Sequence, residues 1–392
     1  MSRSNPNLLY RVYSYRLYPS RAQRKTLVHQ LDICRRLYNE LLSLNVEVYK
    51  KHKYNISREC TLLKYLKFEN PELLTINSQV LQDVCERLQG AFALFFRRLK
   101  KGGNAGFPRY HGVGHRHSSM KFTNQSAKLL PDNRLQLARV GSIKIKLHRD
   151  VPKDSRLMSA TVTLSPNGKW HAVLSYELAA IQPLPKTNKT IGIDLGLSNY
   201  ITTSDGTVID KPNFMGQSVV KIKRVKRKLK KLCKPGAKRS ALDRRLGGLM
   251  EKVNNQRRDF LHKLSRKLIN ENDTVCVENL NVEEMLQSNQ ERMTHKQSYA
   301  LSCTITDAAW TKFTNMLTYK AEEAGRKVML VDPRNTTQVC SGCGVIVRKK
   351  IKQETHKCKK CGLVLSRDHN AAINILRLGT QSLGPNCLDA AI

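Results

Sequence analysis

The sequence lacks the features that mark membrane or secreted proteins. No run of about 18 uncharged apolar residues occurs, so we expect no membrane-spanning helix. The first residues, Met1 to Pro6, lack the apolar core of a signal peptide. The cysteines number eleven, an odd count, and seven of them are scattered through apolar runs, which argues against a disulfide framework. We therefore expect a protein of a reducing compartment, the cytoplasm.

Acidic residues are also scarce. The 392 residues include 31 Asp and Glu against 69 Lys and Arg, which gives a formal net charge of +38. Such an excess repels itself unless a polyanion neutralises it, so nucleic acid is the expected partner over a long contact surface. An anionic membrane is the alternative partner. The apolar content of 40% is enough for real cores, and the length indicates two or three domains.

The positive charge is most concentrated in residues 221–270, which hold nineteen Lys and Arg against three acids. Apolar residues recur there at helical spacing, and Pro235-Gly236 separates a Lys-rich first part from the rest. A solvated charge run is the default interpretation of such a segment. Because the charge is of one sign, we instead predict a helical hairpin that faces nucleic acid.

The N-terminal half combines strands with two helical segments. Residues 8–18 are rich in aromatic and aliphatic side chains and predict a strand. Helical spacing follows Pro19-Ser20 and recurs over 77–100, so a helix-turn-helix is one possible arrangement. Residues 120–180 predict short strands separated by turns, and these favour a small β-barrel that the first strand can join.

From residue 190 the pattern changes again. Strands are expected at 190–196, 199–204, 207–210, 274–280 and 327–332, with helices at about 299–325 and 369–378. Three strands, a helical region, a strand and further helix is an RNase H-like order. The predicted fold class is therefore α+β and multidomain.

A pair of CxxC motifs precedes the last helix. Cys340 and Cys343 are separated by fourteen residues from Cys358 and Cys361. Four thiolates complete a tetrahedral Zn²⁺ site, and a closed site of this kind leaves no position for substrate, so we predict one structural zinc ion. Buried or redox cysteines are the alternative. His356 is expected at the surface and not as a ligand.

Three carboxylates have contexts that suit a Mg²⁺ site. Asp194 and Glu278 follow apolar β-branched runs, and Asp368 precedes a helix. Carboxylates at strand ends are what Mg²⁺ needs when it also holds phosphate oxygens. Each has a structural alternative, since Asp194 could be a turn acid and Asp368 could cap its helix. Among the other acids, Asp205 and Asp332 resemble turn residues, and Asp307 is a further candidate.

These motifs resemble the TnpB (OrfB) family of RNA-guided nucleases encoded in insertion-sequence transposons, over nearly the whole length. The most specific stretches surround the cysteines and the third carboxylate. The matching segments are residues 37–39, 106–110, 122–124, 192–196, 277–280, 307–310, 319–321, 337–344 and 367–372.

The resemblance implies a domain plan. It comprises a β-barrel wedge (1–19 and 116–186), a helical recognition domain (20–115), a RuvC-like nuclease domain (187–336 and 363–378), a zinc ribbon (337–362) and a tail (379–392). It also implies that Asp194, Glu278 and Asp368 are catalytic ligands of two Mg²⁺ ions, and that the cysteines hold zinc.

The implied partners are a guide RNA from the transposon end and double-stranded target DNA next to a short recognised motif. We expect no membrane contact, and a monomer, in a prokaryotic cytoplasm. Tentative nucleic-acid contacts are Arg35, Arg36, Arg97, Arg98, Arg109, Lys223, Arg224, Lys226, Arg227, Lys228, Lys230 and Lys231. The alternatives are a miniature type V CRISPR effector, a nuclease-inactive RNA-guided DNA-binding protein, and a strand-transfer transposase.

Overall fold

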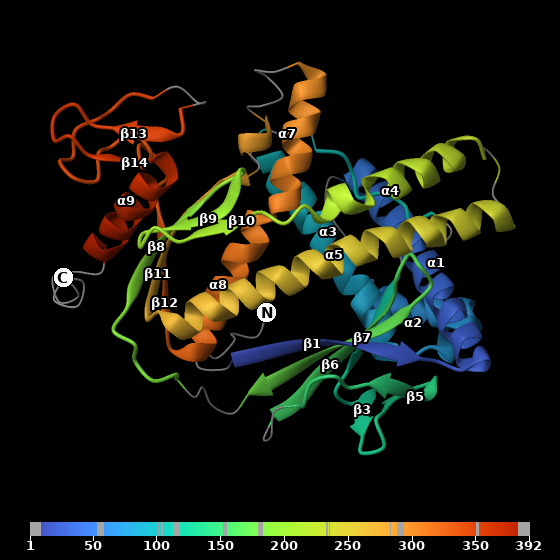
Figure 1. Cartoon of the computed structure of the whole chain (residues 1–392). Helices are drawn as coiled ribbons and strands as arrows, with labels where there is room; N and C mark the ends of the chain where they lie inside the picture. The colour runs from blue at the N-terminus through green and yellow to red at the C-terminus, as the bar shows by residue number, and fades with distance from the viewer. Residues whose placement is uncertain are drawn as a thin grey trace. The chain divides into compact units, whose positions relative to one another are not determined.

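The computed structural model describes residues 9–52, 59–100, 102, 105–112, 118–151, 155–178, 183–232, 234, 236–282, 284–287, 294–349 and 353–382. The chain divides into two compact units, residues 1–180 and 181–392 (Figure 1). The expected tail around Gly384-Pro385 lies outside the described residues. None of the described helices is long and apolar enough to cross a membrane.

The first unit is built on one seven-stranded antiparallel sheet. Its strands are β1 (Leu9–Tyr18), β2 (Ser119–Thr123), β3 (Ala127–Leu130), β4 (Arg134–Leu137), β5 (Gly141–Lys146), β6 (Ser155–Leu164) and β7 (Trp170–Leu178). The order is β2-β6-β7-β1-β5-β4-β3, and β3 also contacts β6, so the sheet curls into a nearly closed barrel. The first strand does join it, as predicted, because its alternate side chains, such as Tyr15 and Leu17, are buried with those of β7.

Helices cover this sheet. They are α1 (Arg21–His52), α2 (Glu59–Glu69), the 3₁₀ helix η1 (Pro71–Thr75) and α3 (Ser78–Lys100). The sequence predicted α1 and α3 from their apolar stripes but not α2 or η1. The two helices from which a helix-turn-helix was one possible arrangement, α1 and α3, do pack together, but α2 and η1 lie between them in the chain.

The second unit contains a five-stranded mixed sheet. Its strands are β8 (Thr190–Leu195), β9 (Asn199–Thr203), β10 (Val208–Asp210), β11 (Thr274–Glu278) and β12 (Lys327–Val331). The order is β10-β9-β8-β11-β12, with β8, β11 and β12 parallel and with β9 and β10 antiparallel to their neighbours. All five strands were predicted: β8, β9 and β11 are almost wholly buried, whereas β10 and β12 at the two edges are partly exposed.

Helices pack on both faces of this sheet (Figure 1). The helices of this unit are α4 (Phe214–Lys230), α5 (Ala237–Glu271), α7 (His295–Ala308), α8 (Trp310–Ala324) and α9 (Arg367–Gln381), of which α4 packs chiefly on α5. The odd-numbered residues of β8 and β11 pack with α5 and α8. The even-numbered Cys276 packs with α9. Side chains alternate along a strand, so the two helical layers cover opposite faces of the sheet.

One helix was predicted at about 299–325, and this prediction was wrong. Two helices form, because Ala309 adopts a left-handed conformation with φ 53° between α7 and α8. Asp307, just before this break, is ion-paired with Arg257 of α5. The last helix was also misjudged in length, since α9 extends to Gln381.

Candidate functional site

Asp194 and Glu278 lie side by side at the carboxyl ends of two parallel strands. The register between β8 and β11 pairs Ile193 with Val277, and each carboxylate comes one position later in its strand. Adjacent strands are about 4.8 Å apart, so the two acids share one edge and one face of the sheet. Both are buried, with 7% of each residue exposed.

Asp368 comes from α9, which packs on the same face. The close approach depends on Gly192, where an added Cβ would lie 2.2 Å from the carbonyl oxygen of Ala372. The glycine thus lets backbone approach backbone. Ser366 caps α9 by accepting a hydrogen bond from the backbone N–H of His369, so Asp368 lies in the first turn and is not the cap. The capping alternative for Asp368 is therefore wrong.

The three carboxylates interact electrostatically. Burial, followed by the charges of Glu278 and Asp368, raises the pKa of Asp194 well above its ordinary value, while the guanidinium of Arg367 opposes the shift. Burial also raises the pKa of Glu278, against a hydrogen bond from Thr336. Buried like charges of this kind are stabilised by a cation, so the residues fit a divalent metal with oxygen ligands.

The four cysteines form a tighter cluster than the three carboxylates. Among the described residues, the four cysteines are the group whose ligand atoms all lie within 4.8 Å of one another. The three carboxylates do not meet that condition.

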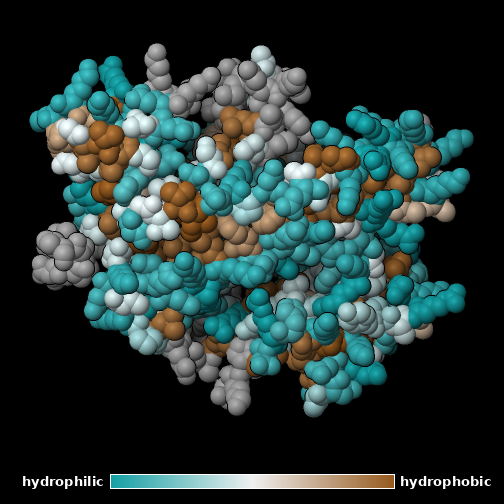
Figure 2. Space-filling view, in the orientation of Figure 1, coloured by the Kyte–Doolittle hydropathy of each residue, from teal (hydrophilic) through white to brown (hydrophobic). Residues whose placement is uncertain are grey.

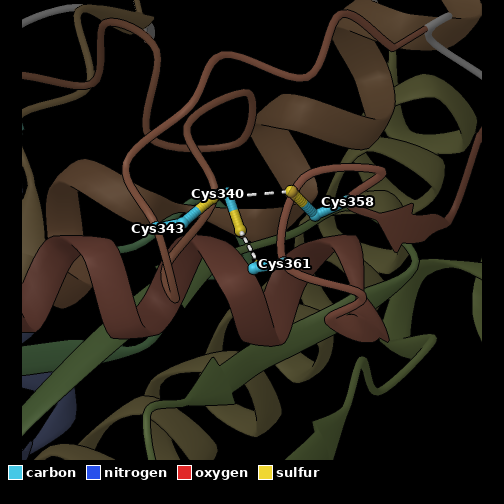
Figure 3. A group of neighbouring side chains, drawn as sticks. All are labelled: Cys340, Cys343, Cys358 and Cys361. Carbon is cyan, nitrogen blue, oxygen red and sulfur yellow. Dashed lines mark hydrogen bonds between the residues drawn. The ribbon is translucent and has the colours of Figure 1, made fainter.

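The four cysteine sulfurs converge from two similar turns (Figure 3). In each turn the glycine directly after the second cysteine has a left-handed φ, 75° at Gly344 and 76° at Gly362. The N–H of each glycine donates to the carbonyl of the first cysteine of its own motif, at 2.9 and 3.0 Å. Sulfur–sulfur distances across the two turns are 3.5 and 3.6 Å. The cluster can bind a zinc ion.

The thiol environment also favours a metal. Backbone N–H groups of Cys361 and Lys360 lower the pKa of the Cys358 thiol, whereas hydrogen bonds with the other three thiols raise the pKa of Cys361, so the clustered thiols ionise together most readily around a cation. His356 was expected at the surface, and this was wrong. The hairpin of β13 (Thr355–Lys357) and β14 (Val364–Ser366) turns its ring inward, where it is 0% exposed. It is not part of the cysteine cluster.

Two buried asparagines join the cysteine segment to α9, and sequence reasoning missed their role. Asn370 accepts a hydrogen bond from the Ser341 N–H and donates to the Val339 carbonyl. Asn374, one turn later, donates to the carbonyls of Val339 and Thr336. A polar pair at i and i+4 on an otherwise apolar helix face was the available signal.

Thr336 completes this connection. Its hydroxyl donates to Glu278 Oε1 at 2.6 Å, and the residue is 2% exposed. Glu278, Thr336, Asn374 and α9 therefore form one hydrogen-bonded series from the second carboxylate to the helix of the third.

The other acids considered have structural roles. Asp205 accepts hydrogen bonds from the Thr203 hydroxyl and the Thr207 N–H inside the β9–β10 turn. Asp332 accepts from the Arg334 N–H. Both were predicted as turn residues, and both are. Asp307 is held by Arg257, so it does not join the three carboxylates.

The α4 helix presents a one-sided basic surface. Ile222 and Val225 are buried, whereas the seven predicted contacts from Lys223 to Lys231 are all exposed. In Figure 2 the surface over α4 and the adjoining part of α5 is largely hydrophilic. In the first unit Arg97, Arg98 and Arg109 are exposed. Arg35 and Arg36 instead make ion pairs with Asp32, and Arg36 also pairs with Glu72.

The first unit also contains a polar cavity of about 390 Å³ at the start of α3. Gln79 lies in its wall, donates to Gln125 Oε1 at 2.8 Å and accepts from the Thr123 hydroxyl. Lys67 and Arg139 add positive charge to the wall. Sequence reasoning missed this cavity, because its residues come from separate elements.

Comparisons with known proteins agree with these features. Three family profiles match, described as "Probable transposase" over residues 173–289, "Helix-turn-helix domain" over 9–54 and "Cas12f1-like, TNB domain" over 310–375. The second of these covers β1 and the single helix α1.

Relatives match over most of the chain. A "Putative RNA-guided DNA endonuclease" of Streptomyces pristinaespiralis is 30% identical over 375 residues, which are 94% of this chain and 89% of the relative. The "Putative RNA-guided DNA endonuclease InsQ" of Escherichia coli K12 is 28% identical, over 77% of this chain and 74% of the relative.

A solved structure shares the fold. It is the cryo-EM structure of a Cas12f1–sgRNA–target DNA complex, with a TM-score of 0.57 and 16% identity, covering 94% of this chain and 99% of that chain. Together with the motifs around the carboxylates and cysteines, the long match to the Streptomyces relative shows that this chain belongs to the TnpB (OrfB) family.

Proposed function

We propose that this protein is an RNA-guided DNA endonuclease that hydrolyses target DNA at Asp194, Glu278 and Asp368. The observation that carries the proposal is the convergence of these carboxylates on one face of the sheet, with the pKa of Asp194 raised by burial and by the other two charges. Relatives described as putative RNA-guided DNA endonucleases agree with this activity.

The carboxylates would hold two Mg²⁺ ions, with Asp194 serving both and Glu278 and Asp368 serving one each. When bound, such ions supply Lewis-acid activation of the phosphate and of water. The chain's own residues order this site. Thr336 fixes one oxygen of Glu278, and Arg367 donates to Asp368 Oδ1 at 3.0 Å. Arg367 also offers a guanidinium that can contact a phosphate oxygen.

The strand order β10-β9-β8-β11-β12 supports a RuvC-like assignment of the nuclease domain. The cysteine turns would form a zinc ribbon within this nuclease domain. The domain boundaries are those that the family resemblance implies. Because the ribbon is hydrogen-bonded to α9 through Asn370 and Asn374, the zinc ion would act structurally, by keeping Asp368 in place.

A guide RNA and double-stranded DNA are the proposed partners. The exposed cations of α4, with Arg97, Arg98 and Arg109, suit backbone contacts to a guide–target duplex. The polar cavity at the start of α3, with Lys67 and Arg139 in its wall, offers a further contact point for the DNA next to the target.

Replacing Asp194 tests the proposal directly. The Asp194→Ala variant should bind guide RNA and target DNA like the wild type but should not cleave in the presence of Mg²⁺. Asp205→Ala is a matched control, since Asp205 lies nearby in the β9–β10 turn and serves the turn alone. Cleavage by Asp194→Ala at the wild-type rate would exclude the assignment.

A miniature type V CRISPR effector is the second candidate, favoured by the match of residues 310–375 to the Cas12f1-like profile. The two candidates differ in the source of the guide. Sequencing of RNA that co-purifies with the protein separates them, because a guide from the flank of its own gene supports the transposon function and a CRISPR repeat supports the effector.

A further inference from the structure

A cavity of about 750 Å³ opens between β10, the start of α4 and the middle of α5, away from the residues assigned above. Apolar side chains form much of its wall, and polar side chains of α5 border it. The lining residues are Ile209, Pro212, Phe214, Gln256, Asp259, Phe260, Lys263, Leu264 and Lys267. Figure 2 shows apolar surface beside this part of α5, bordered by hydrophilic surface.

Two aromatic rings form the centre of this wall. Phe214 and Phe260 are half-buried and make an edge-to-face pair, with centroids 6.1 Å apart and planes at 64°. Tyr200, which is buried, packs against the inner side of Phe260 at 5.2 Å. Phe214 is fixed by the cap of α4, where Asn213 accepts from the Gly216 N–H. The rings are thus held in place while part of their surface remains open.

Positive charge surrounds the rings. Lys263 and Lys267 are exposed one turn apart on α5, and the one acid in the wall, Asp259, pairs with Lys263 at 2.8 Å. The N-terminus of α4, with its partial positive charge, also begins at the cavity. Open aromatic rings with cations beside them bind unpaired nucleotides, because bases stack on the rings and phosphates contact the lysines.

We propose that this cavity binds one unpaired nucleotide of a single-stranded nucleic acid, with its base stacked on the ring of Phe214 and bordered by Phe260, and with its phosphates at Lys263 and Lys267. The proposal rests on the RNA-guided function for the presence of nucleic acid. Gln256 is the one amide in the wall, and stacking suits every base, so the site tolerates any sequence.

The cavity does not hold the nucleotide that is cut. Asp194, Thr202 and Val208 are in register across β8, β9 and β10, so they share one face of the sheet. Ile209, the next residue, faces the opposite side, toward α5. The bound nucleotide therefore anchors a strand on the α5 face, and its loss should affect binding without changing the chemistry at the carboxylates.

A tryptophan reporter tests the site. The full-length Phe214→Trp variant is titrated in EDTA with a 12-residue oligouridine, the matching oligodeoxyuridine and an abasic 12-mer with the same phosphates. Stacking predicts quenching by the base-containing probes and little by the abasic one. Phe214→Ala should lower affinity for the base-containing probes about tenfold and leave the abasic probe unchanged. Stronger quenching by the RNA or the DNA probe identifies the natural ligand.

Val220→Trp is the matched control, because Val220 is 65% exposed on the same helix and is not part of the cavity wall. Its fluorescence should not distinguish base-containing from abasic probes. If Phe214→Trp behaves like this control, or responds to no oligonucleotide, the proposal is overturned and the cavity is left as an apolar surface for protein. Quenching that persists in a protein with no guided cleavage would overturn the proposed function and leave the cavity assignment intact.

Discussion

The four cysteines and the three carboxylates are assembled in different ways. Each pair of cysteines lies within one short turn, and the two turns carry the same glycine conformation and the same hydrogen bond. The carboxylates come from two strands and a helix, and they meet only through sheet pairing and the packing of α9. The comparison teaches that the cysteine cluster is a local structure, whereas the carboxylate cluster depends on the whole second unit.

The largest effect is expected from removing one thiol of the cysteine cluster. Cys340→Ser should lower zinc content from one ion per chain to near zero and lower the thermal midpoint sharply. Structural zinc sites contribute about 10–16 kcal/mol of apparent binding free energy in zinc-finger peptides. Metal analysis and thermal denaturation measure both effects. Ser341→Ala, in the same turn, should change neither, and equal zinc content in Cys340→Ser would remove Cys340 from the ligand set.

The next effect concerns the packing that assembles the distant site. Gly192→Ala should destabilise the protein by about 1–3 kcal/mol or more, because its Cβ would overlap the Ala372 carbonyl. Gly248→Ala on α5 meets no atom within 4 Å and should stabilise by about 0.5–1 kcal/mol. Chemical denaturation gives both values. A neutral Gly192→Ala would show that α9 can move away from β8 at little cost.

A smaller effect is expected when the charge of Asp194 is removed while the size of its side chain is kept. The folded-state pKa of Asp194 is above its unfolded value, so ionisation of Asp194 costs stability as pH rises from about 3.8 through the raised pKa. Without metal, Asp194→Asn should therefore raise the thermal midpoint near pH 8. At pH 3 the gain should shrink, since Asp194 is then largely protonated in both the folded and the unfolded state.

Asp205→Asn is the control for the direction of this change in stability. Burial raises the pKa of Asp205, but hydrogen bonds from Thr203 and Thr207 together outweigh burial and lower it. The charge of Asp205 therefore stabilises the folded state at pH values above the pKa that Asp205 has in the unfolded state. The variant should lose stability at neutral pH. A loss of stability in Asp194→Asn as well would contradict the assignment of Asp194 as a buried, unfavourable charge.

The smallest effect is a shift in pH dependence. Thr336 lowers the pKa of Glu278 through its hydrogen bond, against the larger effect of burial. Thr336→Val should raise that pKa further, so Mg²⁺ binding should weaken at a higher pH than in the wild type as the solution is acidified. Calorimetric titration across pH measures this. Thr337→Val, at the neighbouring position, should leave the profile in place.

Many elements could be predicted from the sequence because their signals are local. All five strands of the second sheet follow from apolar β-branched runs, and the long helices α1, α3 and α5 follow from apolar residues at helical spacing. The break at Ala309 could not be predicted, because nothing about an alanine signals a left-handed conformation. Burial of His356 was missed for a similar reason, since the hairpin decides which face turns inward.

The candidate sites divide in the same way. The sequence by itself determined the cysteine pairs, the three candidate acids and the basic segment from 221 to 270, because spacing and charge are properties of the chain. Only the tertiary structure decided that Asp194 lies beside Glu278, that Thr336 and Asn374 connect Glu278 to α9, and that Phe214 meets Phe260. These contacts join residues far apart in sequence, so they exist only once the sheet pairs and the helices pack upon it.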